Sequence, residues 1–301
     1  MNRLAVVPFL VACLGVASFT LMDAVMKDLS IAIGVYNGML WRMHAGILMS
    51  GSVFFGMRSR WPSVDVMKLH MLRSAVATVV ALAFFWGIVR VPLAEGIAIT
   101  FVAPLIALYL AALWLGEEVG SSAVLASLLG IAGVIVIVAG KFQFGYSRDA
   151  AFGLSALFGS AVLYAVNLVL QRKLAQVAAP IEVGFFQNVF SLPLLALAAP
   201  WLGVIPPVVQ VPSIVAVAAL SLVSVALLSW AYARAEAQVL LPVEYTAFIW
   251  AALLGWIWWG ESITVWTLVG TALIVMGCVL ANYNSKKIFV FWVKFLKTNI
   301  P

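Results

Sequence analysis

The chain is built from long apolar runs that are separated by short polar stretches. A helix needs about 20 apolar residues to cross a bilayer. The runs predict ten membrane spans, at 4–26, 33–56, 69–89, 92–115, 120–139, 151–172, 182–203, 212–233, 238–259 and 263–283. They are continuous, without the alternation of membrane barrel strands, so we expect helices. The fold class predicted from this pattern is an all-α, polytopic membrane protein.

The second half of the pattern repeats the first at an offset of 144 residues. The clearest match aligns residues 90–117 with 234–261, and its identical pairs include Arg90/Arg234, Ala107/Ala251, Gly116/Gly260 and Glu117/Glu261. Five spans in each half would place the two copies in opposite orientations in the bilayer. Such 5+5 inverted repeats surround a midplane site in many secondary transporters. We expect a first repeat at 5–140, a second at 151–283 and a basic tail at 284–301.

The composition supports lipid as the surrounding solvent. Apolar residues make up 65% of the chain and charged residues 9%, whereas soluble domains have about 45–50% and about 25%. The two cysteines, Cys13 and Cys278, lie inside apolar runs and favour packing over a disulfide or a metal site. The net charge of +6 fits a membrane surface better than a nucleic acid.

The placement of Lys and Arg predicts the orientation. With the N-terminus inside, twelve of these residues flank the cytoplasmic side and four the outside. Both termini are therefore expected in the cytoplasm. The first apolar run continues past Cys13 to Met22, which favours a full span over a cleaved signal or lipoprotein segment. The tail at 286–297 fits either an amphipathic helix on the cytoplasmic leaflet or a frayed basic end.

A family resemblance follows from the fourth span and its repeat. The run from Pro92 to Pro104, closed by Leu115-Gly116-Glu117, resembles the fourth-helix signature of EamA-type transporters of the drug/metabolite transporter (DMT) superfamily. The run from 242 to 261 resembles the second-half counterpart, although Phe248 stands where the first half has Pro104. The resemblance covers nearly the whole chain. It implies two EamA domains, a bacterial inner membrane and export or exchange of small metabolites.

Charged residues inside spans are the first functional candidates, because each costs roughly 2.5–3.5 kcal/mol at the bilayer centre. Arg42 lies near the middle of the second span and must face a cavity or a carboxylate. It either binds substrate or forms a structural ion pair. Asp23 lies four residues before Lys27, which suggests an ion pair along one helix. The alternative is that Asp23 acts as a gate or as the counterion of Arg42.

Glu244 is the candidate for energy coupling. It follows Pro242 in the ninth span, where a broken helix is a common transporter feature. A carboxylate there could carry a proton, or it could be solvated near the cytoplasmic face.

Polar and aromatic residues at middle depth complete a predicted substrate site. With Arg42, the set is Tyr36, Trp41, Trp86, Tyr164, Asn167, Gln187, Tyr245 and Trp250, and Asn37, His44, Asn188 and Trp230 lie at similar depth. Individually, such residues more often make hydrogen bonds between helices. We expect the third, fourth, eighth and ninth spans to surround one central cavity.

The predicted function is secondary transport of an amino-acid-like metabolite by alternating access, with export as the expected direction. No phosphate loop, His-Glu-x-x-His, Cys-x-x-Cys or Gly-x-Ser-x-Gly motif supports an enzyme. We expect no cofactor, no metal and no nucleic-acid partner. A non-transporting scaffold or receptor is the second alternative. Homodimer formation through the fifth and tenth spans is a further expectation, based on their small residues.

Overall fold

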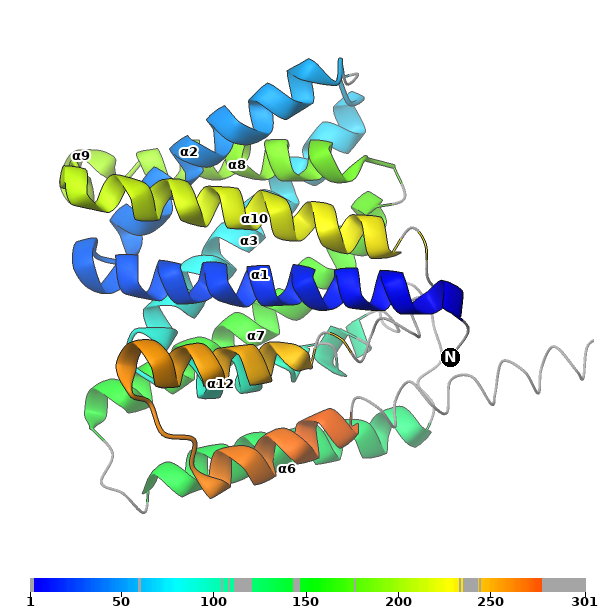
Figure 1. Ribbon diagram of the computed structural model, residues 1–301, viewed down its shortest axis with the longest axis vertical. Helices are drawn as coiled ribbons and strands as arrows, with labels where there is room; N and C mark the ends of the chain where they lie inside the picture. The colour runs from blue at the N-terminus through cyan, green and yellow to red at the C-terminus, as the bar shows by residue number, and fades with distance from the viewer. Residues whose placement is uncertain are drawn as a thin grey trace, which may run out of the picture.

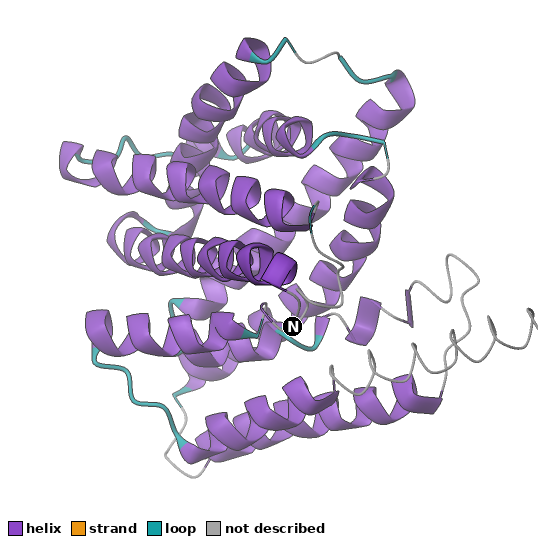
Figure 2. Cartoon of the chain, turned by 45° about the vertical axis from the view of Figure 1, so that its right-hand side comes forward, coloured by secondary structure: helices purple, strands orange, loops and turns teal. Residues whose placement is uncertain are grey.

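A computed structural model describes residues 3–58, 61–103, 105–107, 109–110, 121–142, 147–175, 177–232, 234, 243 and 245–277. Within these ranges the regular secondary structure is entirely helical, as Figure 2 shows. The all-α prediction is confirmed. Four helical segments are long and apolar enough to cross a membrane, by length and composition: Val7–Ile33, Val64–Ile88, Arg148–Gln171 and Val208–Leu228.

The helices of the first half are α1 (Arg3–Ile33), α2 (Val35–Gly56), α3 (Val64–Ile88), α4 (Leu93–Thr100) and α6 (Ser121–Phe142). Those of the second half are α7 (Arg148–Ala175), α8 (Pro180–Ala196), the short α9 (Ala199–Leu202), η1 (Val208–Gln210), α10 (Val211–Tyr232) and α12 (Thr246–Trp259). A last apolar helix covers Val265–Gly277.

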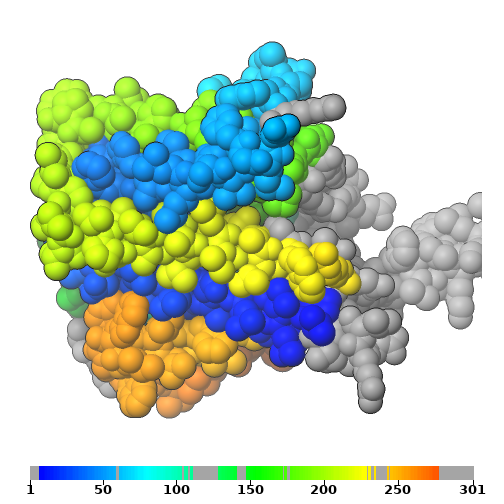
Figure 3. Space-filling model, turned by 45° about the horizontal axis from the view of Figure 1, so that its top comes forward, coloured from blue at the N-terminus to red at the C-terminus, as the bar shows by residue number. Residues whose placement is uncertain are grey.

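The helices form two layers that each mix both halves of the chain. In the first layer α2, α10, α1 and α12 lie side by side, and Figure 3 shows α10 between α2 and α1. In the second layer α8, α3, α7 and α4 follow each other through the same kind of contacts. The layers meet where α2 contacts α8 and where α4 contacts α12.

The contacts between helices obey an internal two-fold symmetry. By chain order α1, α2, α3 and α4 correspond to α7, α8, α10 and α12. The most extensive interface, α1 with α10, corresponds to the next most extensive, α7 with α3. The contacts of α1 with α12 and of α2 with α10 likewise correspond to those of α7 with α4 and of α8 with α3. The tertiary structure therefore repeats as the sequence does.

Several predicted boundaries need correction. The first span, expected to end at residue 26, continues as α1 to Ile33, so Lys27 lies within the helix. The fourth span is not continuous, because α4 ends at Thr100 and the amides of Phe101 and Val102 bond to carbonyls three residues back. Helical hydrogen bonding resumes at Ile106, whose amide bonds to the carbonyl of Val102 at 3.1 Å. The interruption is therefore a short turn at residues 101–102.

The fifth and tenth predicted spans pack on each other at the edge of the two layers, as Figure 1 shows for α6 and the 265–277 helix. A Cβ atom added at Gly133 would lie 2.5 Å from the carbonyl oxygen of Gly270, and the reverse substitution meets the same obstacle. These glycines allow backbone contact within one chain. Dimer formation through these helices stays a prediction.

Candidate functional site

Asp23 and Arg42 form an interior charged pair without a direct bond. Asp23 on α1 is 6% exposed, and Arg42 lies on the neighbouring α2. Each is the charged group that acts electrostatically on the other. Among the described residues, however, no nitrogen of Arg42 lies within 4.0 Å of an Asp23 oxygen. The electrostatic interaction connects Asp23 to Arg42, whereas Lys27 interacts with Glu261 and Glu95, and a role of Asp23 as gate or counterion stays a prediction.

The guanidinium of Arg42 has little else to bind. Its one hydrogen bond within the described part of the chain goes to the sulfur of Met39, at 3.8 Å. An arginine carries five N–H donors, and sulfur is a weak acceptor. A half-buried guanidinium and a buried carboxylate that interact electrostatically without a direct bond can hold a ligand that carries both charges.

The predicted ion pair between Asp23 and Lys27 is wrong. Lys27 is 3% exposed and donates to Glu261 at 2.5 Å and to the carbonyl of Val91 at 3.0 Å. Its ammonium also lies 4.7 Å from the ring centroid of Trp259. The second oxygen of Glu261 accepts the amide of Leu93, at 2.8 Å, and thereby caps α4.

These contacts join three segments that are distant in sequence at one end of the molecule. Glu95 on α4 is 1% exposed, accepts a hydrogen bond from Thr267 at 3.2 Å and acts electrostatically on Lys27. Glu95 and Glu261 line a small cavity with Thr267 and Ser262. We call Lys27, Glu261, Glu95 and Thr267 the outer cluster, from the side on which the predicted topology places it.

Three predicted site residues on α2 are bonded to the end of α8 or to the connection between α8 and α10. Trp41 donates to the carbonyl of Val204 at 2.9 Å, and Asn37 accepts the amide of the same residue at 2.8 Å. Tyr36 donates to the carbonyl of Leu195 at 2.5 Å. The polar atoms of Trp41 and Asn37 thus hold a loop, whereas the Tyr36 side chain also lines a groove.

That groove has a volume of about 390 Å³ and lies between α2 and α3. Its walls include two of the predicted residues, Tyr36 and Trp86, with Val35, Val79, Leu82 and Ala83. The expected central cavity had the third, fourth, eighth and ninth spans as its walls, and α3 alone of these contributes here. Instead α4 and α12 contact each other, and the rings of Phe101 and Tyr245 meet edge to face at 5.4 Å.

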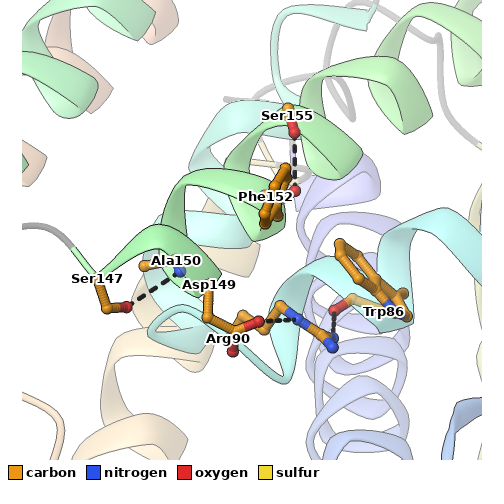
Figure 4. Close-up of polar contacts among 7 residues, drawn as sticks. All are labelled: Trp86, Arg90, Ser147, Asp149, Ala150, Phe152 and Ser155. Carbon is orange, nitrogen blue, oxygen red and sulfur yellow. Dashed lines mark hydrogen bonds and ion pairs between the residues drawn. The ribbon is translucent and has the colours of Figure 1, made fainter.

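Trp86 has a second role, beneath Arg90. The guanidinium of Arg90 lies 3.6 Å from the Trp86 ring centroid and donates to the Trp86 carbonyl at 2.7 Å. Figure 4 shows Arg90 reaching to Asp149 at the start of α7, where the Nε–Oδ1 distance is 2.9 Å. Arg234 covers the ring of Trp230 in the same way, at 4.2 Å. Trp86 and Trp230 are equivalent positions of the repeat.

Tyr164 and Gln187 both interact with Arg73, which the sequence analysis used only to predict the orientation of the chain in the membrane. Arg73 on α3 donates to Gln187 of α8 at 2.8 Å and to Gln171 of α7 at 3.4 Å. Tyr164 of α7 acts on it electrostatically. Asn167, which is 4% exposed, lies on the same face of α7. The missed signal is that Arg73 lies inside the third predicted span, near its start, and has no acidic residue within four positions on either side.

Two remaining candidates lie elsewhere. The indole nitrogen of Trp250 is buried without a hydrogen-bond partner among the described residues, and its ring packs with Ala12, Val16 and Ala231 between α1, α10 and α12. Glu244 lies outside the described residues.

The fold and these interior charges define a multi-pass helical membrane protein built from two related halves. The chain belongs to the EamA-like transporter family, whose model matches twice, at residues 7–139 and 151–283. It is 24% identical over 281 residues to the pseudopaline exporter CntI of Pseudomonas aeruginosa, covering 92% of this chain and 96% of that one. It is 28% identical over 231 residues to a riboflavin transporter of Vibrio cholerae, covering 72% of each.

A solved crystal structure supports the same architecture. It aligns with 92% of this chain and 98% of its own at a TM-score of 0.60 and 22% identity. At that identity the likeness concerns the fold. The relatives carry different substrates by name, so the family membership gives the class of activity without its substrate.

Proposed function

We propose that this protein is a ten-span secondary transporter that exports a small amino-acid-like metabolite across the bacterial inner membrane, with both termini in the cytoplasm. Its family, its two-fold helix contacts and its buried charges support this function. Alternating access requires a site near the junction of two halves that can face either side. The two relatives described above are named as transport proteins, a pseudopaline exporter and a riboflavin transporter.

The observation that carries the proposal is the separation of Asp23 from Arg42. Two opposite charges that attract each other inside a membrane protein would form a direct pair if their role were only structural. Here the two side chains are not in direct contact, and each keeps hydrogen-bonding capacity that no described residue uses. A zwitterion fits this arrangement, with its carboxylate on Arg42 and its ammonium on Asp23. The aromatic wall of the groove at Tyr36 and Trp86 suits an apolar side chain.

The outer cluster indicates to which side of the membrane this conformation is closed. Lys27, Glu261 and the amide of Leu93 connect α1, α4 and the segment after α12 at the predicted outer end. Opening that end requires breaking a buried ion pair. We infer that the structure corresponds to a state closed to the outside.

The test is counterflow in liposomes that contain the purified protein. Vesicles are loaded with one unlabelled amino acid at a time, and uptake of the labelled form is followed. We expect exchange of at least one amino acid by the wild type and background uptake by Arg42→Ala and Asp23→Asn. Lys68→Ala, in an exposed ion pair with Asp65, is the control and should transport normally. Full exchange by Arg42→Ala would contradict the proposed site.

Energy coupling through Glu244 remains a prediction from sequence. Glu244→Gln is expected to remove the dependence of transport on an imposed pH gradient while exchange survives. The measurement is flux at a clamped membrane potential with a stepped external pH. Wild-type flux that ignores the step would exclude proton coupling.

A further inference from the structure

Arg73 has the surroundings of a second binding site. Its guanidinium bridges three helices through the side-chain oxygens of Gln187 and Gln171, which are neutral amides. Gln187 in turn donates to Ser191 at 2.9 Å, and Ser191 accepts a bond from Thr78 at 2.7 Å. The groups in this chain of hydrogen bonds from Arg73 are polar and uncharged.

Arg73 has no counterion in the described part of the chain. No carboxylate oxygen there lies within 4.0 Å of it. Its Nε atom is buried without a hydrogen-bond partner. It lies nine residues into α3 and four residues beyond the start of the predicted third span, or about 6 Å along the helix axis at 1.5 Å per residue. A guanidinium whose buried Nε has no partner is stabilised by an anion that can reach it.

The repeat shows what is missing. On α7, Tyr164, Asn167 and Gln171 share one face at spacings of three and four residues. Their equivalents on α1, 144 positions earlier, are Thr20, Asp23 and Lys27. The position that carries a carboxylate in the first half therefore carries an amide, Asn167, one helical turn before Gln171, which accepts a bond from Arg73. The oxygen Oδ1 of Asn167 is buried without a hydrogen-bond partner among the described residues.

We propose that Arg73 and this face of α7 bind the carboxylate of a small organic acid, as a station of the transport route distinct from the Asp23–Arg42 pair. One guanidinium neutralises one negative charge, which favours a monocarboxylate over a phosphate dianion. Gln171 and Gln187 orient the guanidinium, and their amide nitrogens can donate to the bound anion. The inference rests on the proposed transport function, since a route through the membrane brings the ligand to Arg73.

The experiment measures thermal unfolding of the purified full-length chain in detergent at pH 7, with sodium acetate, sodium phosphate or sodium chloride at equal ionic strength. We expect acetate to raise the Tm of the wild type saturably by about 2 °C or more relative to chloride. Because Arg42 is itself proposed to bind a carboxylate, Arg73→Gln should reduce this response, Arg73→Gln with Arg42→Gln should abolish it, and Lys68→Gln should behave as wild type. Without acetate, Arg73→Gln should be at least as stable as the wild type, because no charged partner is stranded.

Three outcomes overturn the inference: an unchanged acetate response in Arg73→Gln, a wild-type response to phosphate that acetate does not produce, or no acetate response in the wild type. The phosphate result would indicate a site for a phosphate group, such as a lipid head group. Gln171→Leu with Gln187→Leu provides a second route that keeps the charge. It should weaken the response, and an unchanged response would contradict the assigned site. Failure of counterflow in the wild type would instead remove the transport function and leave acetate binding as a separate result.

Discussion

The polar faces of α1 and α7 occupy equivalent places in the two halves and carry different chemistry. Thr20, Asp23 and Lys27 on α1 match Tyr164, Asn167 and Gln171 on α7 at identical spacings. On α1, Asp23 interacts with Arg42, and Lys27 interacts with Glu261. Each charged residue of this face therefore has a partner of opposite charge. On α7 the same positions are neutral and adjoin Arg73. The duplicated backbone positions are kept, while the charges on them are not.

The difference separates two roles for buried charge. Lys27 and Glu261 are in direct contact and join α1 to the segment after α12. Arg42 and Arg73 lack a direct carboxylate partner in the described part of the chain. A fully bonded pair stabilises one conformation, whereas an unpaired guanidinium favours a conformation in which an anion is bound. The following predictions test this distinction.

The largest effect is expected at Arg42. Arg42→Ala should reduce counterflow to background while leaving folded protein in the membrane, because the guanidinium has no direct partner to strand. Flux and Tm are measured on the same preparation. A purely structural pair would instead lose about 3–5 kcal/mol of stability, so a large drop in Tm together with residual transport would favour that role.

Lys27 should behave in the opposite way. Lys27→Met leaves Glu261 without its ion-pair partner and should lower the free energy of unfolding by about 3–5 kcal/mol. Lys27→Met with Glu261→Gln should recover much of the loss, since it leaves no charge behind. Denaturant unfolding of the single and double variants gives the coupling energy. Additive losses would show that the two side chains do not stabilise one another.

Restoring the acid in the second half sharpens the comparison. Asn167→Asp places a carboxylate on α7 one helical turn from Gln171, the partner of Arg73, and it should reduce the acetate-dependent rise in Tm by occupying the guanidinium. Asn188→Asp on α8 adds the same charge, away from that face, and serves as the control. Thermal unfolding with and without acetate is the measurement. An undiminished response in Asn167→Asp would mean that the residue does not reach Arg73.

The smallest effect is expected where a charged pair lies at the surface. Asp149→Asn removes the bond to Arg90, but the Asp149 side chain is 68% exposed. Exposed pairs contribute about 0–1 kcal/mol, and salt weakens them. The stacking of Arg90 on Trp86 should persist. We expect a change in unfolding free energy below about 1 kcal/mol that shrinks further at high salt, and a larger loss would indicate a role in joining the halves.

Periodic and local features of the fold could be predicted from the sequence. The helices α2, α3, α7 and α10 lie close to the predicted spans, because continuous apolar runs between polar stretches have few alternative structures in lipid. The end of α1 could not be predicted. The predicted first span stops at residue 26, before the charge of Lys27, but Lys27 is bonded to Glu261, a residue 234 positions away. A pattern along one helix does not contain such a partner.

The candidate site was predictable in part for the same reason. Arg42 and Asp23 were visible because charges are rare in apolar runs, and their proximity was one of two alternatives. Arg73 was grouped with the basic residues at the inner side, because depth within a span is uncertain by several positions at its ends. The bonds of Trp41 and Asn37 to the backbone of Val204 could not be predicted. Every residue has the same main-chain groups, so the sequence does not identify a main-chain partner.

The contact between Phe101 and Tyr245 has a geometric consequence. These residues are equivalent positions, 144 apart, and their rings touch. Two equivalent points can meet only on the axis that relates the halves. In the proposed alternating-access cycle the halves exchange conformations, so every off-axis residue would move between two different environments, but a residue on the axis would keep the same neighbour. This aromatic pair, at the interruption after α4, is thus placed to act as a fulcrum, equally engaged whichever side of the membrane the transporter faces.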